Sequence, residues 1–419
     1  MTPEVKQRIE QIRQGIVPEG YKKTKSDIVP VDWKESSIGE YICEYTEKTT
    51  IPNQYPVLTS ARTGLMLQTD YYSNRQVTTE DNVGYNVLPY GYITFRSRSD
   101  DGRFRFNENR IIERGIISYF YPVFSFSEEV CHEYMLYLLN FSIYRRMYSY
   151  AEGTAQQVLS LKKLGQLKYS LPPVREQKKI AEILSTQDKA IELQGRKIEE
   201  LKRFKQGCLE RMFPRKGQKV PETRFPGFTG DWEQRKAKEL FVSTADKGYP
   251  ELPVLSATQD RGMIRRDENS INIFHDKKNE AGYKRVLPGQ FVIHLRSFQG
   301  GFAHSAIEGI TSPAYTVFGF SEPEKHDSEY WKYVFTSKSF IQRLETVTYG
   351  IRDGRSISYE EFLTLGFVYP SKAEQTAIAR YLDKLSDLIT LHQRKLEEMK
   401  RQKKALMQLL LTGIVRVKT

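Results

Sequence analysis

The chain is poor in cysteine and has no long apolar run. Its three cysteines, Cys43, Cys131 and Cys208, lie far apart without a CxxC pair, so we expect neither a zinc site nor a disulfide framework. No signal-peptide segment and no stretch of about 18 apolar residues is present, which argues against export and membrane insertion. The sequence therefore predicts a soluble protein of the reducing cytoplasm with no membrane partner.

The sequence also lacks the short motifs of common nucleotide and metal enzymes. It has no GxxxxGK[ST] phosphate loop, no GxGxxG after a strand and no HExxH. Pro172-Pro173 follows Leu171 instead of the Asp or Asn that the catalytic tetrapeptide of an adenine methyltransferase requires, so we interpret it as the turn before a helix. We therefore expect no catalytic residue and no metal site.

One segment occurs twice, 198 residues apart, in residues 171–213 and again in residues 369–411. The Pro-x-x-x-Glu-Gln sequence that begins at Pro172 recurs at Pro370, and the Arg-Lys-x-Glu-Glu-x-Lys-Arg run of residues 196–203 recurs at residues 394–401. No gap is needed in the alignment, so the segment behaves as one rigid element present in two copies.

Both copies are expected to be long helices that pair with another helix. Their apolar residues recur at alternating steps of three and four, which is the a/d heptad pattern of coiled coils, and it continues for about four heptads. The residues expected at the seam or at partner contacts are Ile180, Leu184, Ile191, Ile198 and Leu201 in the first copy and Ile378, Leu382, Ile389, Leu396 and Met399 in the second. Ordinary amphipathic core helices are the alternative.

A stretch of about 140 residues rich in Tyr, Phe, Gly and Pro precedes each helix. The two stretches share scaffold positions, such as Asp32-Trp33 in the first and Asp231-Trp232 in the second. The residues between these shared positions differ almost completely. The predicted order is an N-terminal helical segment (1–29), a first domain (30–171), a first helix (172–213), a linker (214–224), a second domain (225–369), a second helix (370–412) and a C-terminal tail (413–419).

Charge favours a polyanionic partner. The chain has 64 Lys+Arg against 52 Asp+Glu and a net charge of +12, and many basic residues of the divergent stretches stand beside aromatic ones. Lys and Arg can neutralise phosphates, and Arg can also bond guanine edges in the major groove. A merely solvated basic surface is the alternative.

Taken together, these features resemble the specificity subunit of a type I restriction-modification system, in which two target-recognition domains alternate with two conserved helical regions. The resemblance rests on the repeated Pro-x-x-x-Glu-Gln sequence and charged run, on the second-domain opening Arg224-Phe-Pro-Gly-Phe-Thr-Gly-Asp-Trp-Glu233, and on the segments at residues 295–301, 312–316, 350–359 and 410–413. The first domain departs from this pattern, since Ser97-Arg98 stands where the second domain has Ser297-Phe298.

The resemblance implies an α+β fold in which two globular α/β-mixed target-recognition domains are separated by two long antiparallel coiled-coil helices with pseudo-two-fold symmetry. It implies a non-catalytic subunit that reads a bipartite, asymmetric double-stranded DNA target. Two methyltransferase subunits and, through them, motor-nuclease restriction subunits are the expected partners. S-adenosylmethionine, ATP and Mg are expected in those partners, with no cofactor in this chain.

Three alternatives remain at this point. The chain could serve a related combined restriction-methylation system of the type IIB kind, it could be a nuclease-methyltransferase, or it could be a coiled-coil scaffold with no DNA role. The absence of catalytic motifs argues against the second alternative.

Candidate DNA contacts are basic and amide residues at variable positions that scaffold residues flank. They are Arg62, Arg96, Arg98, Arg103 and Arg105 in the first domain and Gln259, Arg296, Gln299, Arg352 and Arg355 in the second. For each, the alternative is a surface or intradomain salt bridge. The segment from Arg352 to Arg355 could instead be a turn in which Asp353 bonds its own backbone.

Overall fold

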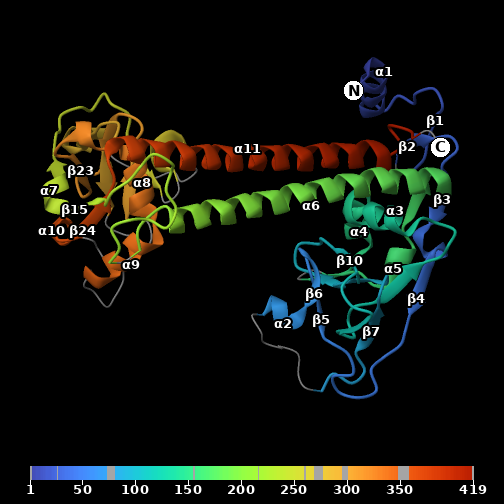
Figure 1. Cartoon of the computed structure of the whole chain (residues 1–419). Helices are drawn as coiled ribbons and strands as arrows, with labels where there is room; N and C mark the ends of the chain where they lie inside the picture. Colours follow the sequence, from blue (N-terminus) through green and yellow to red (C-terminus); the bar gives the residue numbers. More distant parts are fainter. Residues whose placement is uncertain are drawn as a thin grey trace. The chain divides into compact units, whose positions relative to one another are not determined.

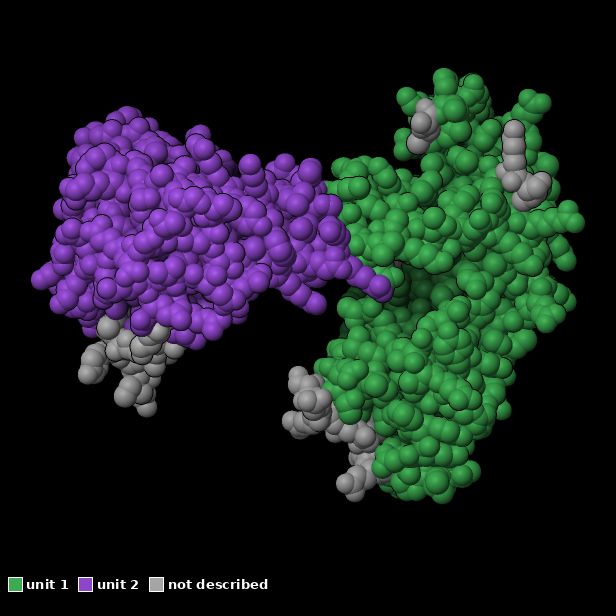
Figure 2. Space-filling model, in the orientation of Figure 1, with its two compact units in different colours: residues 1–194, 395–419 green, residues 195–394 purple. Residues whose placement is uncertain are grey.

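A computed structural model of the chain describes residues 2–25, 27–72, 81–153, 156–215, 217–258, 261–268, 277–294, 301–347 and 358–417. The chain divides into two compact units (Figure 2). The first unit contains residues 1–194 and 395–419, and the second contains residues 195–394. Each unit therefore combines a globular domain with the start of one long helix and the end of the other.

The elements of the first half of the chain are labelled in Figure 1 where space allows. They are α1 (Pro3–Arg13), β1 (Tyr21–Lys23), β2 (Ile28–Pro30), β3 (Lys34–Ser37), η1 (Ile38–Glu40), β4 (Ile42–Tyr45), β5 (Leu58–Ala61), β6 (Gly64–Leu67), α2 (Gln68–Tyr71), β7 (Asn86–Pro89), β8 (Ile93–Phe95), β9 (Arg98–Ser99), β10 (Phe106–Glu108), β11 (Arg114–Ile117), β12 (Val123–Phe126), α3 (His132–Tyr137), the π-helical turn η2 (Leu138–Ser142), α4 (Tyr144–Tyr150), β13 (Gln157–Val158), α5 (Leu161–Gly165), β14 (Lys168–Leu171) and the long helix α6 (Val174–Arg211).

The second half follows a closely similar order. Its elements are β15 (Glu233–Lys236), α7 (Ala237–Leu240), β16 (Phe241–Thr244), β17 (Leu255–Thr258), β18 (Gly262–Arg265), η3 (Arg266–Glu268), η4 (Lys277–Gly282), β19 (Lys284–Val286), β20 (Phe291–Ile293), β21 (Phe302–His304), β22 (Gly309–Thr311), β23 (Thr316–Phe320), η5 (Pro323–Lys325), α8 (Ser328–Thr336), α9 (Lys338–Val347), α10 (Tyr359–Leu363), β24 (Gly366–Tyr369) and the long helix α11 (Lys372–Leu411).

The two domains share one sheet topology. Each has an antiparallel four-stranded sheet, with the order β10-β8-β12-β4 in the first and β21-β20-β23-β16 in the second. In each, a strand near the start of the domain pairs with the strand just before the long helix, as β3 does with β14 and β15 does with β24. The domain start is therefore tied to the point where the helix begins.

Side chains of both long helices close the core of each unit. In the first unit, Leu184 of α6 and Leu410 of α11 lie in one buried cluster with the sheet phenylalanines. In the second unit, Leu382 of α11 and Met212 of α6 lie in the equivalent cluster. Fully burying an apolar side chain stabilises a fold by roughly 1.5–3 kcal/mol, so the helices are part of each core.

The two helices run antiparallel within each unit. In the first unit, Asp188 of α6 pairs with Lys403 of α11, while Leu184, nearer the start of α6, lies with Leu410, nearer the end of α11. The expected fold class, mixed α/β domains joined by long antiparallel helices, is confirmed. The long spans follow from the seam and from the absence of proline within either helix.

Candidate nucleic-acid interface

A small cluster of charged side chains joins the exposed turn between β9 and β10 to Arg62, which lies in the turn between β5 and β6. The Asp101 carboxylate lies 2.8 Å from Nη2 of Arg62 and 4.0 Å from Nε of Arg103. The backbone N–H of Arg103 also donates to Asp101 at 3.1 Å, and this bond is the main reason that the pKa of Asp101 lies below its usual range. Exposed ion pairs of this kind contribute little stability, so either guanidinium can exchange Asp101 for a phosphate at small cost.

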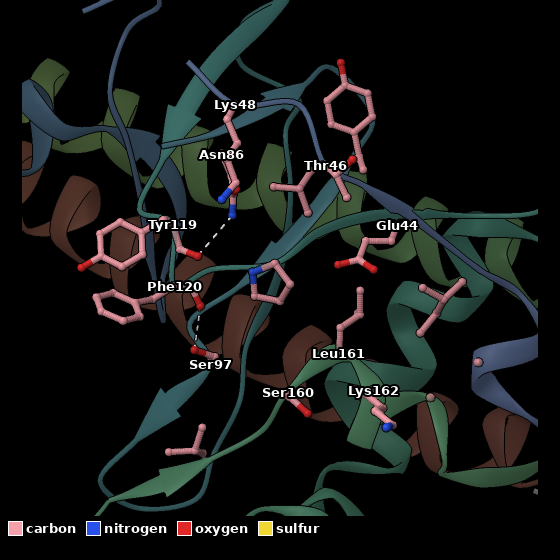
Figure 3. A pocket seen from close by; sticks show the side chains of 17 residues that line it. Glu44, Thr46, Lys48, Asn86, Ser97, Tyr119, Phe120, Ser160, Leu161 and Lys162 are labelled. Carbon is pink, nitrogen blue, oxygen red and sulfur yellow. Dashed lines mark hydrogen bonds between the residues drawn. The ribbon is translucent and has the colours of Figure 1, made fainter. Parts of the chain in front are cut away.

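The other candidates of the first domain lie in different surroundings. Arg96 is exposed just after β8, and Arg98 in β9 places its guanidinium 4.8 Å from the centre of the Phe120 ring. Phe120 lines a groove of about 830 Å³. The Ser97 hydroxyl donates to the backbone carbonyl of Phe120 (Figure 3). Partial burial lowers the pKa of Arg105, and the charge of Asp188 on α6 opposes that effect.

The candidates of the second domain, Gln259, Arg296, Gln299, Arg352 and Arg355, all lie outside the described residues. Gln259 is flanked by the described residues Thr258 and Arg261, in the turn between β17 and β18. There the Thr258 hydroxyl accepts the backbone N–H of Arg261 at 3.1 Å and donates to the carbonyl of Gly262 at 2.8 Å. This turn corresponds to the turn between β5 and β6 that carries Arg62.

The Pro-x-x-x-Glu-Gln motif seats each domain on the start of a long helix. The side-chain oxygen of Gln177 accepts the N–H of Cys131 at 2.8 Å, and its nitrogen donates to the motif proline at 2.9 Å. Gln375 makes the same two bonds, to the N–H of Asp327 and to its own motif proline, both at 2.9 Å. Both glutamines are buried, so removal of either amide leaves backbone groups unsatisfied.

In each unit the motif glutamate forms an ion pair with an arginine, a pairing that the sequence does not predict. Glu374 accepts Nε and Nη2 of Arg224 at 2.6 and 2.7 Å, and Glu176 accepts the same two atoms of Arg416, both at 2.8 Å. These hydrogen bonds raise the pKa of both arginines. Each glutamate side chain is only 2% exposed, and a buried carboxylate requires a cation, so the arginine compensates the buried charge.

A tyrosine, a carboxylate and a lysine connect the first domain to both helices. Tyr137 of α3 donates its hydroxyl to Asp188 of α6 at 2.6 Å, and Lys403 of α11 pairs with the same carboxylate. Nζ of Lys403 lies 5.3 Å from the centre of the Tyr137 ring. Burial, followed by the bond to Asp188, raises the pKa of Tyr137.

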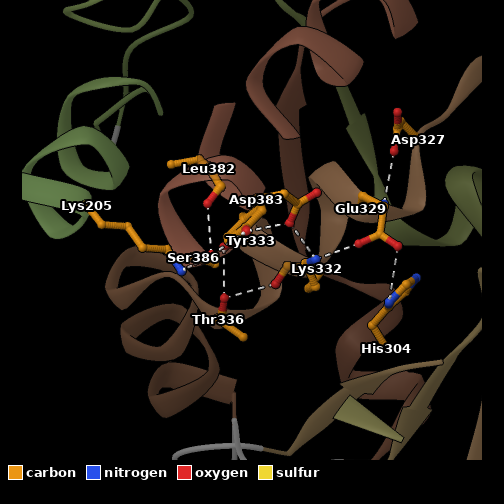
Figure 4. A network of polar contacts seen from close by, with 10 residues as sticks. All are labelled: Lys205, His304, Asp327, Glu329, Lys332, Tyr333, Thr336, Leu382, Asp383 and Ser386. Atoms are coloured by element: carbon orange, nitrogen blue, oxygen red, sulfur yellow. Dashed lines mark hydrogen bonds and ion pairs between the residues drawn. The ribbon is translucent and has the colours of Figure 1, made fainter. Parts of the chain in front are cut away.

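The second unit makes this connection with its carboxylate one helical turn earlier (Figure 4). Tyr333 donates to Asp383 at 2.7 Å, and Lys332 of the same domain helix contacts that carboxylate at 2.9 Å. The position equivalent to Asp188 holds Ser386, which accepts Nζ of Lys205 at 2.7 Å. Burial and then the charge of Lys332 lower the pKa of Lys205.

The residues predicted for the helix seam differ in depth. Those beside the domains, Ile180, Leu184, Ile378 and Leu382, are buried in the domain cores. Ile198 and Leu201 are also buried, whereas Ile191, Ile389, Leu396 and Met399 are half-buried. The seam is therefore deepest where a domain covers it.

In the part of the chain that the structure describes, no group of three or more His, Cys, Asp and Glu side chains could hold a metal ion. Among the described helices, none is long and apolar enough to cross a membrane.

Comparison with known proteins adds independent information. A family model described as the type I restriction modification DNA specificity domain matches residues 30–203. The type I restriction enzyme MjaVIII specificity subunit of Methanocaldococcus jannaschii is 25% identical over 97% of this chain and 98% of its own length. This relative therefore matches over both domains and both helices.

Two solved structures show the same fold. One, from work on complex assembly and conformational transition of the type I R-M system, covers 92% of this chain and 99% of its own, with a TM-score of 0.55 and 15% identity. The other is the type I restriction-modification S subunit from M. genitalium, which covers 96% of this chain and all of its own, with a TM-score of 0.51 and 13% identity.

Proposed function

We propose that this chain is a specificity subunit of a type I restriction-modification system and that each of its two domains reads one half of a bipartite DNA target. A specificity subunit recognises DNA sequence and leaves the chemistry to other subunits. The observation that carries the proposal is the contrast between like supports and unlike surfaces: both domains sit on their helices through the same glutamine bonds and present different exposed residues. Two unlike readers specify two unlike half-sites.

The exposed arginines of the first domain support direct contact with DNA. Arg62, Arg98 and Arg103 are exposed, and their ion pair or ring contact is of the weak kind that solvent-exposed groups make. Guanidinium groups in such positions can neutralise phosphates or bond guanine edges. We assign these three residues to the first half-site.

The partners proposed for the chain are two methyltransferase subunits, with motor-nuclease subunits bound through them. The support is the repeat itself, because two copies of one helical segment offer two copies of one partner equivalent places to dock. S-adenosylmethionine, ATP and Mg would then be bound by those partners, and the complex would work on DNA in the cytoplasm.

Methylome sequencing tests this function directly. The full chain would be expressed with the methyltransferase subunit of its own system in a host without adenine methylation, and single-molecule sequencing would report the modified motif. We expect an interrupted motif with two unlike halves and a methylated adenine on each strand. The methyltransferase alone is the control. A purified, folded complex that yields a palindromic motif, or none, would contradict the proposal.

A salt titration separates DNA reading from a scaffold with no DNA role. If Lys and Arg neutralise phosphates, affinity for duplex DNA should fall by orders of magnitude between about 50 and 200 mM salt, because counterions are released on binding. A coiled-coil scaffold would show no such slope. Incubation of the chain alone with DNA, Mg and S-adenosylmethionine addresses the enzyme alternative, because any turnover would overturn the assignment of a recognition subunit.

A further inference from the structure

One exposed turn is built in the same way in both units. In the first unit, the N–H of Tyr121 donates to the carbonyl of Ser118 at 2.9 Å, and in the second the N–H of Tyr315 donates to Ser312 at 3.1 Å. The first residue of a neighbouring strand then holds the carbonyl of that tyrosine. Asn86 does so at 2.8 Å and Lys284 at 2.6 Å. The backbone of the turn is therefore fixed by equivalent bonds.

The tips of the two turns are different. The first unit places Tyr119 and Phe120 there, with 55% and 46% of their surfaces exposed. The second unit has Pro313 and Ala314 at the same two positions, both exposed. Because Pro-Ala supports the same turn, the fold does not require two large aromatic side chains at this place.

The aromatic pair of the first unit is held in position. The centres of its two rings lie 4.1 Å apart, and the Tyr85 ring meets Tyr119 edge-on at 5.9 Å. The hydroxyl of Ser97 donates to the carbonyl of Phe120 at 2.7 Å, as Figure 3 shows. A ring positioned in this way loses little conformational freedom on binding, which favours contact with a flat ligand.

Basic residues flank the pair on the same side of the domain. The guanidinium of Arg98 lies over Phe120, and the charge of Arg96 acts on the adjacent Tyr121, where it opposes the rise in pKa that burial causes. An exposed aromatic pair beside two arginines is the arrangement that proteins use to stack unpaired bases while holding the backbone.

We propose that Tyr119 and Phe120 form a stacking platform for a DNA base that leaves the duplex stack at the first half-site, a contact that the equivalent turn of the second reader lacks. The inference rests on the proposed function and names the ligand class of one surface. Docking of a methyltransferase is the competing use of this turn. That use is disfavoured, because a partner bound twice in equivalent ways should meet equivalent residues, and Pro313 and Ala314 are not equivalent to an aromatic pair.

The test compares two variants in the full chain, purified with its methyltransferase. One is Tyr119→Ala with Phe120→Ala, and the other is Tyr119→Pro with Phe120→Ala, which installs the tip that the second unit tolerates. Loss of one stacked base should weaken binding to the methylome-defined target roughly 5- to 100-fold. Tyr90→Ala is the matched control, because Tyr90 is 54% exposed and also has an arginine 5.9 Å from its ring centre. Its effect should stay within about twofold.

Altered targets assign the loss to one half-site. Scrambling the first half-site should cost the aromatic variants less affinity than it costs the wild type, whereas scrambling the second should cost both the same. A scan with 2-aminopurine should show one position in the first half-site whose fluorescence differs between wild type and variants. Phe120→Trp, which keeps the aromatic face, should retain binding.

Three outcomes would overturn the platform. Wild-type affinity in both variants would do so, and so would a loss from scrambling the first half-site that is the same in the wild type and the variants. Loss of methyltransferase co-purification with unchanged DNA affinity would reassign the turn to protein docking. Thermal unfolding checks that the Pro-Ala tip folds. If the wild-type protein shows no preference for its target sequence, the proposed function itself fails. If the wild type is selective and both variants bind DNA as tightly as it does, only the stacking platform is ruled out.

Discussion

The two units connect a domain tyrosine to the long helices through carboxylates at different positions. In the first, Asp188 receives both the Tyr137 hydroxyl and Lys403. In the second, Asp383 receives the Tyr333 hydroxyl, and Lys205 turns to Ser386 instead. The tyrosine and the lysine keep their places while the carboxylate changes its position along the helix. What the fold requires is thus a charge facing the tyrosine, whichever residue supplies it.

The outward turns differ more freely than the helix contacts. The buried Gln177 and Gln375 make identical bonds, whereas the exposed tip has Tyr119-Phe120 in one unit and Pro313-Ala314 in the other. Buried polar groups tolerate little change, because each lost partner leaves an unsatisfied donor or acceptor. Surface residues carry no such constraint, so they are free to distinguish one target from another.

The largest effect is expected when one of the two units is removed, which tests whether the two halves of the repeat are equivalent. A fragment ending near Arg215 retains α6 and loses the α11 segment that closes the first core. A second copy can supply the missing surface, since Lys205 and Met212 occupy the repeat positions of Lys403 and Leu410. We expect a two-fold homodimer that, with its methyltransferase, modifies an interrupted palindrome made of the first half-site twice.

Methylome sequencing and the mass of the purified fragment give the answer. An asymmetric motif, or a well-folded dimer with no motif, would mean that the two helix copies are not interchangeable. The full chain in the same host is the control, and it should modify only the asymmetric target.

Charged substitutions in the seam should reveal how differently the units use it. Ile198 is 4% exposed in the second unit, whereas Leu396 is half-buried in the first. Ile198→Asp should destabilise by about 4 kcal/mol and Leu396→Asp by about 2 kcal/mol, because the cost of a buried carboxylate grows with its loss of water. Urea unfolding measures both. Equal effects, or normal stability in both variants, would show that the seam does not pack as described.

The two glutamate-arginine pairs should differ in strength. Arg224→Ala strands Glu374 and should lower stability by roughly 3 kcal/mol. Arg416→Ala should lower it by about 1 kcal/mol, since the Arg416 side chain is 37% exposed and the N–H of Val417 still donates to Glu176. Hydrogen exchange within each unit separates the two effects. Arg215→Ala, which breaks an exposed pair, is the control and should change stability very little.

The smallest expected effect concerns Asp101, which holds two arginines of the first reader. Because its folded pKa lies below its ordinary value, its contribution to stability is present above about pH 4 and is lost as the pH falls through the lowered pKa. Asp101→Asn should raise affinity for duplex DNA by less than about fivefold, since it removes one negative charge beside Arg62 and Arg103. Filter binding at fixed salt measures the change, and a weakened affinity would contradict the expected release of the arginines.

The fold was largely predictable from the repeat. A heptad seam needs only local spacing, so the helices that contain Ile180 and Ile378 follow from sequence alone, and family resemblance supplied their antiparallel pairing. The fine structure of the domains was less accessible, because their strands are short and their pairs join residues far apart, as Lys34 and Leu171 are.

The interface was less predictable than the fold. Arg416 lies 240 residues from Glu176, and it stands at a different distance from its helix than Arg224 does, so comparison of the repeats does not reveal the pair. The Tyr119-Phe120 tip is not among the contacts predicted from sequence, since basic and amide side chains are the usual partners of phosphates and base edges. Only the exposure of the two rings and the position of Arg98 mark that turn.

The division of each helix between two units has a consequence for biosynthesis. The first core needs Met407, Leu410 and Leu411, so it stays open while the ribosome adds the 200 residues from 195 to 394. At about 5–20 residues per second this interval lasts roughly 10–40 s, long enough for an open apolar core to attract chaperones. The second unit, although encoded later, can close before the first. Completion of the reader that is made first therefore waits for synthesis of the last turns of α11.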